Sequence, residues 1–222
     1  LVLEKSSRAN MRMRIFNADG SEAEMCGNGA RCAALYAKLE GSRAVKSRIN
    51  IETKAGIIES EVDKDNVRIK LTTPKSLRLD IPLKINNRIL KVNFINTGVP
   101  HVVIFSSGLS KIDIAPLGRI IRNHKYFSPR GANVNFVEVK GEGIISVRTY
   151  ERGVEDETLA CGTGSVASSL IFSLKSGCSS AVTVITSGGE MLKVYFERMR
   201  DKFDNVWLEG RARVVFRGVF SY

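Results

Sequence analysis

Two cysteines, Cys26 and Cys161, stand in the same short motif, Cys-Gly-x-Gly, and each motif precedes an alanine- or serine-rich run that a glycine ends. Such a run is typical of a helix, so each cysteine is expected at a helix start. The first N–H groups of a helix have no acceptor within it and carry partial positive charge, which favours a thiolate or a bound carboxylate there. The residue types therefore indicate thiols that accept and donate protons beside a carboxylate ligand.

The two motifs lie in a duplicated stretch of the chain. Residues 14–30 align with residues 148–165 after one inserted residue, and both copies run from a strand through an acidic turn to Cys-Gly-x-Gly and a helix. One copy alone is better explained by a packing cysteine beside a tight turn, but two copies in matching contexts favour function. We therefore expect two homologous halves, each of which carries part of the site.

Two thiols on opposed halves suit one kind of reaction. One thiolate removes a proton from one face of a carbon, and the other thiol donates a proton to the opposite face. The pattern predicts racemisation or epimerisation of an α-amino acid, whose carboxylate lies across the two helix starts while charge develops on the carbon. No cofactor is expected, because no motif for one is recognised in the sequence.

The other two cysteines, Cys32 and Cys178, have no such context and are interpreted as structural. An intracellular cysteine is by default a small buried apolar residue. There is no Cys-x-x-Cys, and neither His101 nor His124 has a metal-ligand spacing to a cysteine, so no metal site is expected.

The overall composition is that of a globular protein. The chain has 222 residues, 43% of them apolar, and 34 Lys and Arg against 23 Asp and Glu, a net charge of +11. The positive excess is spread along the chain, and basic segments such as residues 8–14 and 119–125 are interpreted as solvated faces of amphipathic elements. No apolar run approaches the roughly 20 residues of a membrane helix and no signal peptide opens the chain, so a soluble intracellular protein is expected.

Periodicity in the sequence predicts many short strands and few helices. The predicted helices are residues 30–40, 114–124 and 165–176. The predicted strands are residues 11–17, 49–53, 57–63, 67–72, 91–97, 101–105, 132–139, 144–150, 181–187, 191–197 and 206–216.

This order of elements favours an α/β chain of the α+β type with mixed, mostly antiparallel sheets, since strands outnumber helices and short turns join them. We expect two pseudo-symmetric domains, each a sheet wrapped around a central helix, with the active site in the cleft between them. The first domain is predicted to comprise residues 1–70 plus 208–222, and the second residues 71–207.

Two segments resemble the signature motifs of the diaminopimelate epimerases, cofactor-independent enzymes of lysine and peptidoglycan precursor synthesis. They read RIFNADGSEAEMCGNGARC at residues 14–32 and YERGVEDETLACGTGS at residues 150–165, and the resemblance extends over the whole chain. The first segment is specific, since the related proline racemases usually have Cys-Gly-His where this chain has Cys26-Gly27-Asn28. The resemblance implies an enzyme that interconverts LL- and meso-diaminopimelate, a dicarboxylate, in the cytoplasm and as a homodimer, with no nucleic-acid or membrane partner.

The resemblance also assigns roles to residues. It implies that Cys26 and Cys161 are the acid/base thiols, that Glu151 and His101 belong to the catalytic set, and that Arg152 suits a distal carboxylate. The substrate-binding residues that it implies are Asn17, Gly27, Asn28, Asn133, Glu151, Arg152, Gly162 and Thr163.

Simpler roles exist for several of these residues. Asn17 precedes Ala-Asp-Gly and is also suited to shaping a turn, Glu151 and Arg152 to an exposed ion pair, and His101 to a purely structural position. The alternative functions are another racemase or isomerase of the same fold, a non-catalytic basic module that binds anions or nucleic acid, and a structural subunit.

The chain departs from the family pattern at two places. Family members commonly read Gly-Asn-Pro-His where this chain has Val99 before Pro100. We expect either that Asn96 or water replaces a substrate-binding asparagine, or that recognition of the distal end of the substrate differs. Family members also begin about fifty residues earlier, with a Gly-Asn-Asp-Phe strand. We expect that preceding segment to supply further core and substrate contacts.

Overall fold

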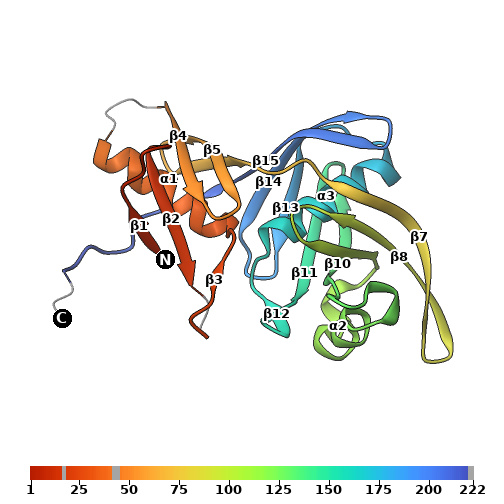
Figure 1. Ribbon diagram of the computed structural model, residues 1–222. Helices are drawn as coiled ribbons and strands as arrows, with labels where there is room; N and C mark the ends of the chain where they lie inside the picture. The colour runs from red at the N-terminus through yellow and green to blue at the C-terminus, as the bar shows by residue number, and fades with distance from the viewer. Residues whose placement is uncertain (17–18, 42–45, 220–222) are drawn as a thin grey trace. The chain divides into compact units, whose positions relative to one another are not determined.

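The computed structural model describes residues 1–16, 19–41 and 46–219. The chain divides into two compact units, of which the first comprises Leu1–Lys70 and the residues from Glu209 onward and the second comprises Leu71–Leu208. These limits differ by one residue from the predicted domain boundary, which stays a prediction. Both units combine a mostly antiparallel sheet with few helices (Figure 1), so the predicted α+β class is confirmed.

Unit 1 is a five-stranded sheet in the order β1-β2-β4-β5-β6, with the short strand β3 paired to β2 and the helix α1 packed against it. Its elements are β1 (Val2–Glu4), β2 (Met11–Phe16), β3 (Glu22–Ala23), α1 (Gly27–Gly41), β4 (Lys46–Thr53), β5 (Gly56–Asp63) and β6 (Asn66–Lys70). Buried alanines on α1, among them Ala30, Ala33 and Ala34, let the helix approach the sheet closely. The chain returns to this unit at its end, where the Ala212 N–H donates to the Asp65 carbonyl.

Unit 2 is built on the strand order β15-β14-β13-β11-β10-β9-β8-β7, with β12 paired to β11. Its strands are β7 (Lys75–Ile85), β8 (Arg88–Asn96), β9 (Pro100–Phe105), β10 (Asn133–Gly141), β11 (Ile144–Glu151), β12 (Asp156–Thr158), β13 (Val182–Thr186), β14 (Met191–Met199) and β15 (Lys202–Arg211), whose last residues lie in unit 1. Its helices are α2 (Ile114–Arg122), α3 (Gly162–Ser176) and the short 3-10 helices η1 (Leu109–Lys111) and η2 (Lys125–Phe127).

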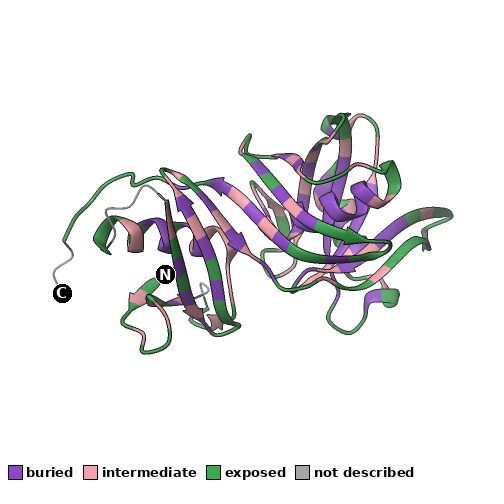
Figure 2. Cartoon of the chain, turned by 90° about the horizontal axis from the view of Figure 1, so that it is seen from above, coloured by how far each residue is buried: buried purple, intermediate pink, exposed green. Residues whose placement is uncertain are grey.

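The helix α3 is the centre of unit 2. Every residue from Gly164 to Ser173 is buried, whereas α1 of unit 1 leaves Tyr36 and Leu39 about half exposed. Figure 2 shows the buried positions alternating with exposed ones along the strands, the period of two expected of sheets covered on one face. A central helix is therefore better enclosed in unit 2 than in unit 1.

Each unit contains the same strand–strand–helix–strand sequence around its motif. β2 and β4 are parallel neighbours joined through β3 and α1, and β11 and β13 are parallel neighbours joined through β12 and α3. A parallel pair requires such a crossover connection. The internal repeat inferred from sequence thus corresponds to two copies of one supersecondary unit.

An ion pair recurs at the same place in both copies. Arg14 on β2 donates through Nε and Nη2 to the two carboxylate oxygens of Glu22 on β3, at 2.9 and 3.2 Å. Arg148 on β11 does the same to Glu157 on β12, at 2.7 and 2.6 Å. Hydrogen bonding to arginine is the main cause that holds the pKa of each glutamate below its ordinary value. These pairs fasten the short strand that leads to each cysteine.

The sequence pattern missed the long strand β7 and placed the end of the last strand too late. β7 was missed because Pro82 interrupts its pattern and because Ser76 and Asp80, both at positive φ, accompany two register shifts against β8. It is the last strand in the order, where proline is tolerated. The predicted strand 206–216 ends at Arg211, and beyond it Val215 and Phe216 are exposed.

Candidate functional site

Each Cys-Gly-x-Gly motif opens a helix, as predicted. The Cys26 carbonyl accepts the Ala30 N–H at 2.9 Å, and the Cys161 carbonyl accepts the Ser165 N–H at the same distance. Both cysteines therefore immediately precede the first turn of a 15-residue helix, where the N–H groups have no acceptor within the helix. Cys161 is buried and lies 3.7 Å from the Thr163 hydroxyl, measured from Sγ to Oγ1, while Cys26 is half-buried.

Equivalent backbone hydrogen bonds hold the loops that lead into the two helices. In unit 1 the Ala55 N–H, in the turn after β4, donates to the carbonyl of Glu24, two residues before Cys26. In unit 2 the Gly188 N–H, in the turn after β13, donates to the carbonyl of Leu159, two residues before Cys161. The turn after each of these parallel strands thus binds the segment that directly precedes the cysteine.

Unit 2 brings most of its predicted site residues together at the ends of β9, β10 and β11. The Asn133 side-chain oxygen accepts the backbone N–H of Arg152 at 2.7 Å, and Glu151 accepts the Thr158 hydroxyl at 3.0 Å. Asn133 lies directly opposite His101 in the parallel register of β9 and β10. Asn133, Glu151, Arg152 and His101 therefore form one polar cluster, and Glu151 and Arg152 are not paired with each other.

A clamp on the turn between β11 and β12 holds this cluster in place. The Glu155 carboxylate accepts from the Gly153 N–H, from Arg122 on α2 and from the Tyr150 hydroxyl. Burial raises the pKa of Glu155, but these hydrogen bonds outweigh it and hold that pKa below its ordinary value. Sequence reasoning did not identify Glu155, because its ion-pair partner Arg122 lies 33 residues away in the chain, on α2.

Arg152 keeps its positive charge available to a ligand. Its guanidinium donates through Nη1 to the Arg130 carbonyl at 3.3 Å, a neutral acceptor. Within the described ranges no carboxylate lies within 4.0 Å of it. A half-buried arginine without a carboxylate partner is suited to an anionic ligand.

His101 is fully buried and neutral. Burial lowers its pKa to about 3, and the positive charge of Arg152 acts in the same direction. Its Nδ1 lies 3.1 Å from the side-chain nitrogen of Asn135. Its Nε2 has no hydrogen-bond partner in the described part of the chain. Such an unpartnered group is rare in a folded interior, and it leaves Nε2 able to bind a ligand.

We expect the depressed pKa of His101 to make the protein less stable in acid. Below the ordinary value of 6.5 the unfolded chain takes up a proton at His101 that the folded chain excludes until about pH 3. The free energy of unfolding should therefore decrease as the pH is lowered through this window, by about 1.4 kcal/mol per pH unit for one proton. Urea unfolding at a series of pH values should show this slope reduced in His101→Gln, and an unchanged slope would contradict it.

Unit 1 places its predicted residues in the first turn of α1. Gly27 and Asn28 follow Cys26 directly, and the Asn28 side-chain oxygen is buried without a hydrogen-bond partner among the described residues. Asn17 lies outside the described residues. Gly162 and Thr163 occupy the matching first turn of α3 in unit 2.

The remaining cysteines do not belong to either helix start. Cys32 is exposed on α1, which corrects the expectation that it packs in the interior, and the Cys178 thiol donates to the neighbouring Ser179 carbonyl.

No cluster of metal-ligating side chains occurs in the described ranges, and no helix there is long and apolar enough to cross a membrane.

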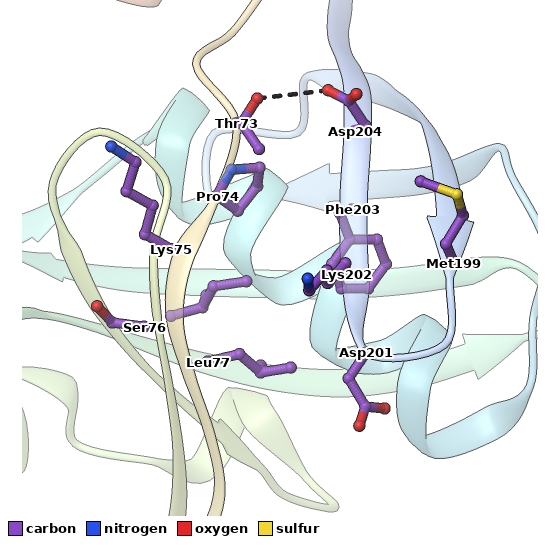
Figure 3. Close-up of a pocket in the computed structure, with 11 residues that line it drawn as sticks. Thr73, Pro74, Lys75, Ser76, Leu77, Met199, Asp201, Lys202, Phe203 and Asp204 are labelled. Atoms are coloured by element: carbon purple, nitrogen blue, oxygen red, sulfur yellow. Dashed lines mark hydrogen bonds between the residues drawn. The ribbon is translucent and has the colours of Figure 1, made fainter.

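Unit 2 also has a groove of about 490 Å³ between the start of β7 and the β14–β15 turn (Figure 3), away from the polar cluster of Asn133, Glu151, Arg152 and His101. Its walls are mainly apolar, with Leu77, Met199 and Phe203, and the Thr73 hydroxyl donates to Asp204 across it at 3.3 Å. None of the predicted site residues lines it. The candidate site is therefore assigned to the helix starts.

Solved structures with similar folds include a probable proline racemase and a phenazine biosynthesis protein. A probable proline racemase from Agrobacterium radiobacter has a TM-score of 0.76 at 14% identity, over 97% of this chain and 75% of that one. A PhzF-family phenazine biosynthesis protein from Bacillus anthracis has a TM-score of 0.69 at 19% identity, over 94% of this chain and 80% of that one. The fold is thus that of the racemase and epimerase class.

Sequence comparison identifies the family within this class. The diaminopimelate epimerase family model matches residues 1–77 and 93–212. Curated diaminopimelate epimerases from Hydrogenobaculum and Chlorobaculum tepidum are 45% and 40% identical over all of this chain, which covers 80% and 84% of their lengths. The chain belongs to the diaminopimelate epimerase family and is an isomerase, as the resemblance implied.

Proposed function

We propose that the chain interconverts LL- and meso-diaminopimelate by proton transfer between Cys26, Cys161 and the substrate α-carbon. Epimerisation of diaminopimelate is the function of the family to which the chain belongs. The observation that carries the two-thiol mechanism is the matched position of both cysteines, each directly before a helix whose first N–H groups point outward.

The reaction that we propose consumes nothing. The thiolate of one cysteine takes the α-proton, so that an S–H bond forms while the C–H bond breaks and its electron pair stays on the carbon. The other cysteine donates its thiol proton to the opposite face of that carbon and becomes a thiolate. The two cysteines thus exchange protonation states in each turnover, and either the reverse reaction or proton exchange with solvent water restores them.

The carbanion in this mechanism needs stabilisation, which the helix starts are suited to provide. The N–H groups of Gly162 and Thr163 in α3, and of Gly27 and Asn28 in α1, belong to first turns without intrahelical acceptors. A substrate α-carboxylate bound by these groups draws negative charge away from the α-carbon as it develops. Closure of the site around the substrate excludes water and strengthens these interactions.

Recognition of the distal end of the substrate is proposed for unit 2. Arg152 has a guanidinium without a carboxylate partner among the described residues, and Asn133 fixes its backbone. Glu151 is a hydrogen-bond acceptor suited to an ammonium group. We further propose that Asn17 contributes a contact from unit 1, and that His101 supports the reacting end.

Solvent exchange tests the proposed function. The protein is incubated with LL-diaminopimelate in deuterated water, and the α-proton signal and the ratio of stereoisomers are followed by NMR. Deuterium incorporation together with appearance of the meso isomer is the expected result. Absence of both would contradict the function, and salt-sensitive DNA binding in their place would favour the anion-binding alternative.

The cellular setting follows from the same family. We propose that the chain serves lysine and peptidoglycan precursor synthesis in the cytoplasm and works as a homodimer without a cofactor. The family resemblance supports all four statements. Light scattering after size-exclusion chromatography measures the assembly directly, and a single-chain mass would contradict the homodimer.

A further inference from the structure

A chain of three buried side chains fixes the orientation of His101. The Asn135 side-chain nitrogen donates to the Val102 carbonyl at 2.9 Å and lies 3.1 Å from His101 Nδ1. The Asn135 side-chain oxygen accepts the Thr149 hydroxyl at 3.0 Å. A flipped amide would turn its oxygen toward the Val102 carbonyl, placing two acceptors together, so the amide has one favourable orientation.

This orientation determines which imidazole nitrogen carries the proton. An amide NH₂ only donates hydrogen bonds, so His101 Nδ1 must accept and cannot hold the proton of the neutral ring. The proton then resides on Nε2. Because His101 is fully buried and its pKa is lowered to about 3, the ring is neutral at physiological pH and presents a single N–H donor.

Asn135 lies against the first turn of α3. A Cβ atom built on Gly164 would lie 2.2 Å from the Asn135 side-chain oxygen and 3.2 Å from Cys161 Sγ. The thiol and the amide therefore flank the same glycine. The His101 and Asn135 pair belongs to the immediate surroundings of the Cys161 helix start.

Among the described residues of unit 1, apolar side chains stand at the place equivalent to this polar chain. Gly29 corresponds to Gly164, and a Cβ atom built on it would meet the apolar atoms of Leu1, Ile15 and Met13. Leu1 precedes Val2, which pairs with Arg14, just as Asn135 precedes Phe136, which pairs with Arg148. The two halves have thus kept the helix start but differ in what lies beneath it.

We propose that Asn135 is a positioning residue that holds His101 in its Nε2–H form, so that the ring offers a fixed donor to an anionic group of the bound substrate beside Cys161. The donor has no acceptor in the described part of the chain, which leaves it for a ligand. The functional half of this inference rests on the proposed function, whereas the tautomer does not.

Nitrogen-15 NMR of the histidine rings tests the tautomer. The chain has only two histidines, so His124→Gln assigns both rings. In the wild type we expect His101 Nε2 to be the protonated nitrogen and Nδ1 the unprotonated one. In Asn135→Asp the new carboxylate accepts in place of the amide donor, so the proton should move to Nδ1.

A matched control and a second variant guard against effects of altered folding. Asn93→Asp changes another buried asparagine of the same sheet, whose side-chain nitrogen donates to the Val103 carbonyl on β9. It should leave His101 as in the wild type. Thr149→Val removes the hydroxyl that binds the Asn135 oxygen but keeps the Val102 carbonyl that fixes the amide, so the His101 proton should stay on Nε2.

The outcomes separate the inference from the proposed function. A His101 proton on Nδ1 in the wild type, or an unchanged tautomer in Asn135→Asp, would overturn the inference whatever the activity. With the tautomer shifted, we expect kcat for epimerisation to fall about 100-fold in Asn135→Asp and not in Asn93→Asp, the loss typical of one fixed donor. A shifted tautomer with unchanged kcat would overturn the positioning role. If the wild-type protein shows the expected tautomer but does not epimerise diaminopimelate, only the proposed function is contradicted.

Discussion

Replacing either Cys26 or Cys161 by alanine is expected to reduce epimerisation of diaminopimelate by about 10³-fold or more, because the proposed mechanism uses one cysteine as the acid or base on each face of the carbon. The folded structure should survive, since Cys26 is half-buried and both side chains are small. The rate is measured from the NMR signals of the two stereoisomers.

Exchange of the α-proton should separate the two variants. A single remaining thiolate can still remove the proton that faces it and return deuterium to the same face. Cys161→Ala is therefore expected to exchange one stereoisomer without inverting it, and Cys26→Ala the other. Inversion at the wild-type rate in either variant would be incompatible with two acid/base thiols.

The chain supplies matched controls for both replacements. Cys32→Ala lies on the same helix as Cys26, and Cys178→Ala follows the helix that Cys161 precedes. Neither side chain belongs to a helix start, so both variants should epimerise as the wild type does. A large loss in these controls would instead indicate that any cysteine replacement disturbs the helices.

The helix starts were predictable from the sequence because their determinants are local. A glycine pair after the cysteine, small residues through the helix, and Gly177 in the left-handed conformation at the end of α3 specify both ends of the element. The duplicated context could be read in the same way, residue by residue. The recurring Arg14–Glu22 and Arg148–Glu157 pairs follow from that duplication but require strand pairing to be seen.

The polar support beneath Cys161 was not predictable in the same way. Asn135 stands in an alternating stretch whose visible signal is a strand, and Thr149 and His101 are distant in sequence. Only the register brings the three side chains together, since Asn135 lies opposite Thr149 and two residues along β10 from Asn133, which is paired with His101. Cross-strand register depends on packing over the whole sheet, so local patterns do not encode it directly.

Gly164→Ala is expected to destabilise the protein by about 2 kcal/mol or more, although alanine alone favours a helix over glycine by about 1 kcal/mol. The new Cβ would lie 2.2 Å from the Asn135 side-chain oxygen, so Asn135 must move. Its movement breaks buried hydrogen bonds to Thr149, Val102 and His101, and each buried group left unsatisfied costs about 1–3 kcal/mol. The loss outweighs the gain, and urea unfolding measures the difference.

Gly29→Ala provides the comparison, because Gly29 holds the same motif position in unit 1. Its new Cβ would lie 2.9 Å from Leu1 Cδ1, the end of a flexible and half-exposed side chain that can rotate away. The helical preference of alanine then remains, so the free energy of unfolding should stay level or rise slightly. Equal destabilisation by the two replacements would mean that the steric requirement comes from the helix start itself, and that the polar chain beneath Cys161 imposes no constraint of its own.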